Sequence, residues 1–135
     1  MNLLRRFFSR KKQETSKPVR IVTDADGLRV FRGDEADPSE LLRWEDVTLV
    51  GAYRKDCYGY DLCCVELLSK GGGAVLIQQQ DEGFVEACIA ITQSLTVSNP
   101  DWFLALQCRQ AFDTSIEIIY QRPVSAEGEP KQASF

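Results

Sequence analysis

The hydrophobic pattern of this chain changes its period near residue 81. Before that point, short apolar and β-branched runs are separated by turn signals such as DADG (24–27) and KGGG (70–73). After it, four apolar residues follow at spacings of four, three and four, which is the stripe of one helix face. They are Phe84, Cys88, Ile91 and Leu95. A group of strands followed by helices indicates an α+β fold.

The expected sheet is antiparallel, because short loops join its strands. Strands are predicted at VRIVT (19–23), LRVFRG (28–33), WEDVTLVGAY (44–53), DLCCVELLS (61–69), AVLIQQ (74–79) and SIEIIYQR (115–122). The Asp-Gly pair of DADG favours a tight hairpin between the first two. The polar, proline-bearing segment DEADPSELL (34–42) is expected to be a loop. We therefore predict one curved antiparallel sheet of about five or six strands.

Two helices are expected beside that sheet. A long amphipathic helix begins near Asp81 and packs its apolar stripe across the sheet. A second, short helix precedes the last strand, because Asn99 is a favoured N-cap and Pro100 a favoured first helical residue. Its core residues are predicted to be Trp102, Phe103, Leu106 and Phe112.

The size and composition predict one domain with polar ends. The chain has 135 residues, of which 44% are hydrophobic, enough for a single substantial core. We divide it into a basic amphipathic segment (1–17), one α+β domain (18–123) and a polar C-terminal tail (124–135).

Charge is distributed very unevenly along the chain. The formal net charge of the whole chain is −4. Residues 1 to 20 carry seven Lys or Arg and one Glu, a net +6, so residues 21 to 135 carry a net −10. An acidic folded surface is a poor match for the phosphates of nucleic acid, so no nucleic-acid partner is expected.

The N-terminal segment combines apolar and basic residues at helical spacing. Its apolar residues are Leu3, Leu4, Phe7 and Phe8, and its basic ones are Arg5, Arg6, Arg10, Lys11 and Lys12. The arginines interrupt the apolar run, so it resembles neither a secretory signal nor a transmembrane span. Three interpretations stay open: a tail that is mobile or packs on its own domain, a segment that adsorbs to an anionic membrane, and an organellar presequence or partner-binding helix.

The cysteines and the absence of histidine argue against most catalytic sites. The five cysteines are an odd number without paired C-x₂₋₄-C spacing, which favours reduced thiols in the cytoplasm, no disulfide and no metal site. Without histidine, His-based acid–base catalysis is excluded. No cofactor is expected, and we predict a non-catalytic protein.

The stretch YRKDCYGYDLCC (53–64) contains the candidate site residues. Asp56 and Asp61 are expected to frame a hairpin turn by accepting backbone N–H groups. Tyr58 and Tyr60 then lie at the tip, where they could contact a partner together with Arg54 and Lys55. The alternative is an unfamiliar enzyme that uses Asp56, Asp61 or Cys57.

Several motifs together resemble a group of small bacterial proteins. They are Trp44 with Val47 and Val50, AYRKD (52–56), Asp61 with LCC (62–64), DEGF (81–84), Trp102, Ala111 with Phe112, and IIYQR (118–122). The resemblance covers about residues 44 to 122. It implies a small α+β protein without an assigned activity, in some cases similar to pleckstrin-homology-type domains or toxin-immunity proteins.

We therefore expect a cytoplasmic interaction protein with an unknown protein partner, one form of which is an immunity-type inhibitor. The alternative function is a peripheral membrane adaptor that uses Arg5, Arg6, Phe7, Phe8, Arg10, Lys11 and Lys12. The sequence leaves the partner and the oligomeric state open.

Overall fold

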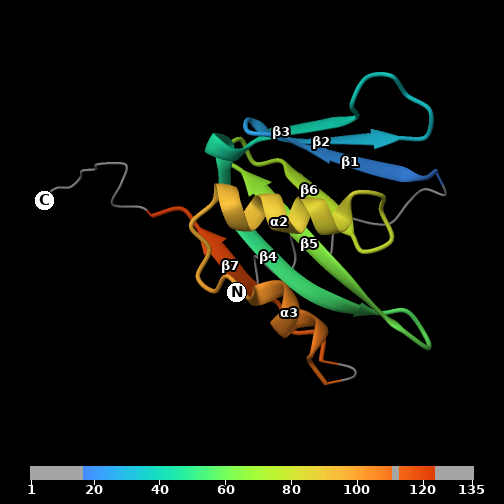
Figure 1. Cartoon of the computed structure of the whole chain (residues 1–135), viewed down its shortest axis with the longest axis vertical. Coiled ribbons are helices and arrows are strands. Elements are labelled where there is room, and N and C mark those ends of the chain that lie inside the picture. The colour runs from blue at the N-terminus through green and yellow to red at the C-terminus, as the bar shows by residue number, and fades with distance from the viewer. Residues whose placement is uncertain (1–16, 111–112, 124–135) are drawn as a thin grey trace, which may run out of the picture.

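The computed structural model describes residues 17–110 and 113–123. Their elements follow the order β1 (Val19–Thr23), β2 (Gly27–Arg32), β3 (Glu40–Arg43), a 3-10 turn (Trp44–Asp46), β4 (Val47–Asp56), β5 (Asp61–Ser69), β6 (Ala74–Gln78), α2 (Phe84–Ser94), α3 (Trp102–Gln107) and β7 (Glu117–Gln121). Strands precede the helices along most of the chain, which confirms the α+β class (Figure 1).

The strands form two antiparallel sheets rather than one. The first has the order β1-β2-β3 and the second the order β6-β5-β4-β7. The prediction of a single sheet with five or six strands is therefore wrong in detail, since the described residues hold seven strands. The unexpected strand is β3, in a segment predicted to be a loop. Leu42 faces the core and Leu41 is exposed, an alternation too short to stand out after the polar residues 34–40.

The turn between β1 and β2 confirms the hairpin that DADG predicts. One oxygen of the Asp24 carboxylate accepts the backbone N–H groups of Asp26 (2.8 Å) and Gly27 (3.1 Å). The indole N–H of Trp44 donates to the carbonyl of Asp24 (2.9 Å). Trp44, which directly follows β3, is thus hydrogen-bonded to the turn between β1 and β2.

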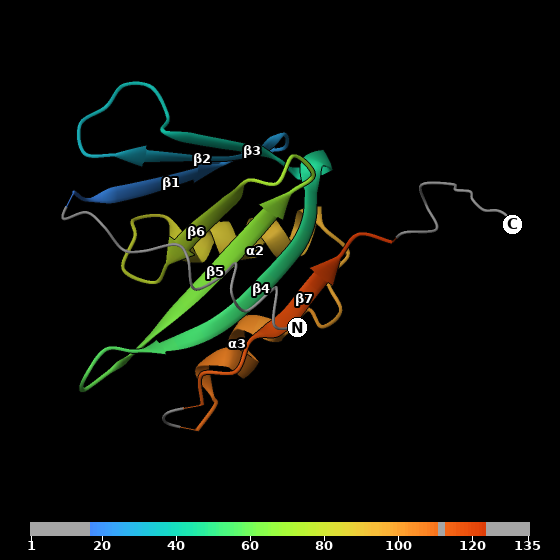
Figure 2. The same ribbon diagram turned by 180° about the vertical axis from the view of Figure 1, so that it is seen from behind.

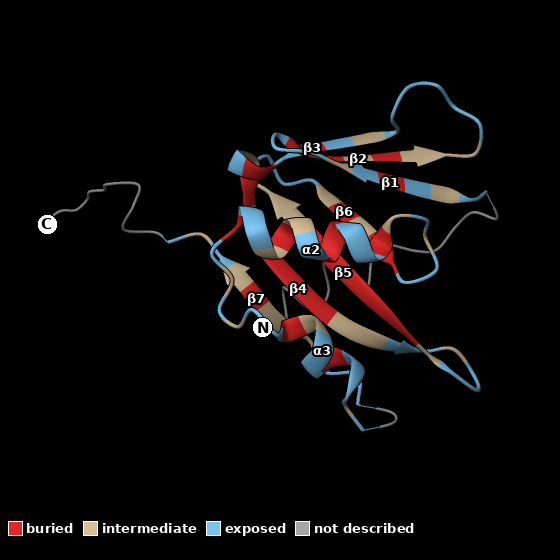
Figure 3. Ribbon diagram, viewed as in Figure 1, coloured by how far each residue is buried: buried red, intermediate tan, exposed pale blue. Residues whose placement is uncertain are grey.

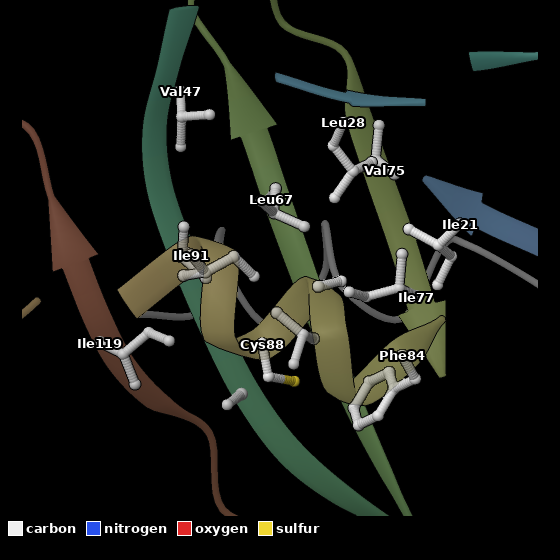
Figure 4. Packing of buried hydrophobic residues seen from close by; sticks show 14 of the residues in the cluster. Ile21, Leu28, Val47, Leu67, Val75, Ile77, Phe84, Cys88, Ile91 and Ile119 are labelled. Carbon is white, nitrogen blue, oxygen red and sulfur yellow. The ribbon is translucent and has the colours of Figure 1, made fainter. Parts of the chain in front are cut away.

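A single core lies between the two sheets and α2 (Figure 4). All four residues of the predicted stripe are buried there: Phe84, Cys88, Ile91 and Leu95. The helix has 11 residues, an ordinary length rather than the long one expected. Gly83 precedes it with a φ of 89°, and a Cβ there would lie 2.2 Å from the carbonyl oxygen of Ile21, so only glycine fits.

Helix α3 begins at Trp102, two residues later than the sequence predicts. The side chain of Asn99 nevertheless accepts a backbone N–H, that of Asp101, at 3.0 Å. Trp102 and Leu106 are buried and Phe103 packs against the core, as expected, whereas Phe112 lies outside the described residues. Among the described residues, no helix has the length and apolar character that spanning a bilayer requires.

Candidate functional site at the hairpin between β4 and β5

The hairpin of β4 and β5 extends beyond the rest of the four-stranded sheet (Figure 1). The two strands pair from Val47 opposite Ser69 to Asp56 opposite Asp61. Four residues, Cys57 to Tyr60, close the turn, and the N–H of Cys57 donates to the carbonyl of Tyr60 at 2.9 Å. Two register irregularities in β4, near Val47 and Val50, allow the long strand to curve.

Both central residues of this turn have positive φ angles, 53° for Tyr58 and 104° for Gly59. A two-residue turn of this kind, type I′, fits the twist of a hairpin and normally contains Asn, Asp or Gly. A bulky aromatic residue in the left-handed region is uncommon and costs free energy. Tyr58 nevertheless occupies it, with 96% of its surface exposed, and Tyr60 is 60% exposed.

The charged residues of the stretch take different roles. The Asp56 carboxylate accepts the N–H of Tyr58 at 3.2 Å, so this aspartate does frame the turn. Lys55 is exposed and Cys57 is partly exposed. Exposed residues mark the far end of the β4–β5 hairpin (Figure 3). The exposed tip therefore comprises Lys55, Tyr58 and Tyr60, and this group is called the tip below.

Arg54 does not belong to that tip. Its guanidinium donates from Nη2 to the Asp61 carboxylate at 2.6 Å, and the two side chains are only 12% and 14% exposed. Its Nη1 donates to the carbonyls of Leu106 (3.3 Å) and Arg109 (2.7 Å), at the end of α3. Arg54 and Asp61 thus fasten the base of the hairpin to a helix, a role different from the partner contact and turn frame expected for them.

An open pocket of about 400 Å³ lies at the base of the hairpin. Its lining brings together Arg54, Asp56, Gly59, Tyr60, Asp61, Cys63, Gln79 and Gln107. Gln79 holds one wall in place, because its side-chain oxygen accepts the N–H of Cys63 at 3.1 Å. Neither glutamine has a sequence signal that links it to residues 54–61, since only the tertiary fold brings them close.

An ion pair and burial fix the charge of several groups in and near the pocket. Asp61 is committed to Arg54. Burial raises the pKa of the Cys63 thiol and raises that of Cys64 and of Cys88 to about 12. These thiols stay protonated near neutral pH and are poor nucleophiles. In the described part of the chain, no group of Cys, Asp or Glu is arranged to hold a metal ion.

The residues predicted to bind membranes lie outside the described residues: Arg5, Arg6, Phe7, Phe8, Arg10, Lys11 and Lys12. The site that the structure brings together from the sequence predictions is therefore the hairpin alone. Comparisons of the chain with protein-family models, with curated proteins and with solved structures find no significant match.

Proposed function

We propose that this protein is a non-catalytic binding protein that engages a protein partner through the tip. The observation that carries the proposal is the position of Tyr58, an aromatic ring that is almost fully exposed at a left-handed turn position. Energetically unfavourable backbone conformations persist mainly where function uses them. Large, rigid side chains of this kind dominate the binding energy of many protein interfaces.

The support beneath the tip suits such a role. The ion pair of Arg54 with Asp61 and the bonds of Arg54 to the end of α3 hold both strands of the hairpin. A contact residue on a rigid base loses little conformational entropy when it binds, and this favours affinity. The bonds at the base therefore support the backbone that carries the two tyrosines.

The charge of the domain suggests the kind of partner. Residues 21 to 135 carry a net −10 and the whole chain a net −4, so a basic protein would be attracted to the acidic domain. An immunity-type inhibitor that binds a basic toxin is the concrete form of the proposal that fits this charge.

The test separates contact from turn stability by changing one residue in two ways. Tyr58→Asn removes the ring but places a residue that is favoured at this turn position, whereas Tyr58→Phe keeps the ring. Tagged full-length proteins capture partners from a lysate of the native host. The affinity of a captured partner is then measured by calorimetry. We expect Tyr58→Asn to raise its Kd by about 30-fold, the effect of a 2 kcal/mol hot spot.

The Tyr58→Phe protein should bind the same partner with a Kd within about threefold of the parent value, because the hydroxyl contributes less than the ring. Circular dichroism and thermal unfolding confirm that both variants are folded. Equal retention of the partner by the parent and the Tyr58→Asn protein would contradict the proposal.

A further inference from the structure

The four-stranded sheet has a second face, opposite α2, over which no described helix or strand lies (Figure 2). Residues that pair across an antiparallel sheet share a face. On this face Cys64 pairs with Tyr53 and Gln78, and Glu66 pairs with Gly51 and Leu76. The neighbouring rows of this face hold Leu49, Leu68 and Ala74 on one side, and Leu62 opposite Lys55 on the other. These rows are called the second face below.

The centre of the second face is nevertheless buried. Cys64 and Glu66 have no exposed surface, and Leu62 is 7% exposed, although none of the three belongs to the core beneath α2. Gly51, directly opposite Glu66, has no side chain with which to cover it. Their burial, on a face over which no described helix or strand lies, calls for a cover from outside the sheet.

The chemistry of the second face defines what that cover must contain. Leucines and a thiol require apolar side chains above them. The carboxylate of Glu66 is buried beside the Tyr53 hydroxyl, and a cation in the cover would favour its charged form, because burial of charge is costly. Tyr53 lies beside it, and burial, together with the neighbouring Cys64 and Glu66, raises the pKa of the Tyr53 hydroxyl.

We infer that residues 1–16 of the same chain cover the second face, with their apolar side chains on the leucines and a basic side chain at Glu66. This segment offers the required combination: Leu3, Leu4, Phe7 and Phe8 beside Arg5, Arg6, Arg10, Lys11 and Lys12. Its charge and its apolar pattern are both complementary to the second face.

The start of the described chain lies at the right place for this contact. The N–H of Glu82 donates to the carbonyl of Val19 (3.0 Å), and the N–H of Ile21 donates to the carbonyl of Glu82 (2.8 Å). Strand β1 therefore begins beside the loop that leaves β6, and β6 is an edge strand of the four-stranded sheet. To contact the second face, a segment that precedes Lys17 therefore has to cross only this edge.

The segment is also long enough. Four strands at about 4.8 Å spacing place the outer two roughly 14 Å apart. Sixteen residues span about 24 Å as a helix, at 1.5 Å per residue, and more when extended. Adsorption to a membrane would use the same four apolar residues, so the two states exclude one another.

Adjacent Cys63 and Cys64 provide the test, because they lie on opposite faces of one strand. In the full-length chain with Cys57→Ser and Cys108→Ser, alkylation by iodoacetamide at pH 8 is followed by fragment mass spectrometry. Adding Phe7→Ala and Phe8→Ala should raise the rate at Cys64 by about 10-fold or more, because two large buried side chains are lost. The rates at Cys63 and Cys88, beneath α2, should not change.

Ser9→Ala with Gln13→Ala is the matched control, since it alters the same segment but keeps its apolar residues. It should leave the rate at Cys64 as in the parent. An unchanged rate at Cys64 in the phenylalanine variant would overturn the inference. A second outcome would also overturn it: the parent protein binds phosphatidylserine-containing vesicles while Cys64 stays protected from alkylation. The segment would then be on the membrane, and something else would cover the sheet.

If the variant with Phe7→Ala and Phe8→Ala unfolds, photo-crosslinking tests whether the segment contacts the second face. A benzophenone amino acid replaces Phe8 in the otherwise native chain, and the crosslinked peptides are identified by mass spectrometry. We expect intramolecular crosslinks to β5 or β6. Crosslinks to other elements of the domain would overturn the inference.

Discussion

The two turns at the ends of β5 both reverse the direction of the chain, but they use different residues. The turn between β5 and β6 uses Lys70 and three glycines, and the N–H of Ser69 donates to the carbonyl of Gly73 at 2.9 Å. The turn between β4 and β5 uses Cys57, Tyr58, Gly59 and Tyr60. Each includes positive φ angles. Reversal of the chain therefore does not need the tyrosines, which supports their assignment to a contact surface.

The bases of the two turns differ as much as their tips. Lys70 forms an ion pair with Asp46 at 3.3 Å, and its side chain is 66% exposed. Arg54 is instead bound to Asp61 and to two carbonyls near the end of α3. Both turns are thus tied to a second element, since the N–H of Lys70 also donates to the carbonyl of Asp46 in the 3-10 turn (2.8 Å). Only the turn with tyrosines is held there by a largely buried side chain.

The largest expected effect comes from removing the Arg54 side chain at the base of the β4–β5 hairpin. Arg54→Ala removes the cation that pairs with the Asp61 carboxylate and the donor to the Arg109 carbonyl, and we expect the free energy of unfolding to fall by about 3 kcal/mol. Lys70→Ala removes only an exposed pair and should cost about 0.5 kcal/mol or less. Urea denaturation of both variants gives the comparison. Equal losses of unfolding free energy in the two variants would contradict the difference between the two turn bases.

An intermediate effect is expected where the turns are alike. Gly59 and Gly72 have φ angles of 104° and 94°, and a Cβ on either would meet no atom within 4 Å. Alanine at either position is therefore strained only by its backbone, and each substitution should cost about 1 kcal/mol. Thermal unfolding measures both. A much larger loss at Gly59 would indicate that the tip is more constrained than its geometry shows.

The smallest expected effect has the opposite sign. Tyr58→Asn should raise the free energy of unfolding by about 0.5 kcal/mol, because asparagine tolerates the left-handed region better than tyrosine does. Tyr60→Asn, at a position without positive φ, is the control and should not stabilise the protein. Chemical denaturation distinguishes the two. A destabilised Tyr58→Asn protein would mean that the Tyr58 ring already supports the free domain.

Much of the local structure could be predicted from the sequence, because local residues dictate it. The DADG hairpin, the stripe from Phe84 to Leu95 and the last strand all depend on neighbours in the chain. Strand β3 was missed because its stability comes from pairing with β2 and from burial of Leu42. In the candidate site, the exposure of the tip was predictable, whereas the carbonyls that bind Arg54 lie 52 and 55 residues away.

The sequence by itself determined the α+β class, the hairpin between β4 and β5 and the apolar face of α2, since these follow from local periodicity and turn chemistry. Only the tertiary structure decided that the strands divide into two sheets and that Arg54 supports the tip without being exposed on it. It also placed Glu66 on a buried sheet face. These features depend on contacts between distant segments, and no local pattern encodes which partner a buried charge or an unpaired strand will meet.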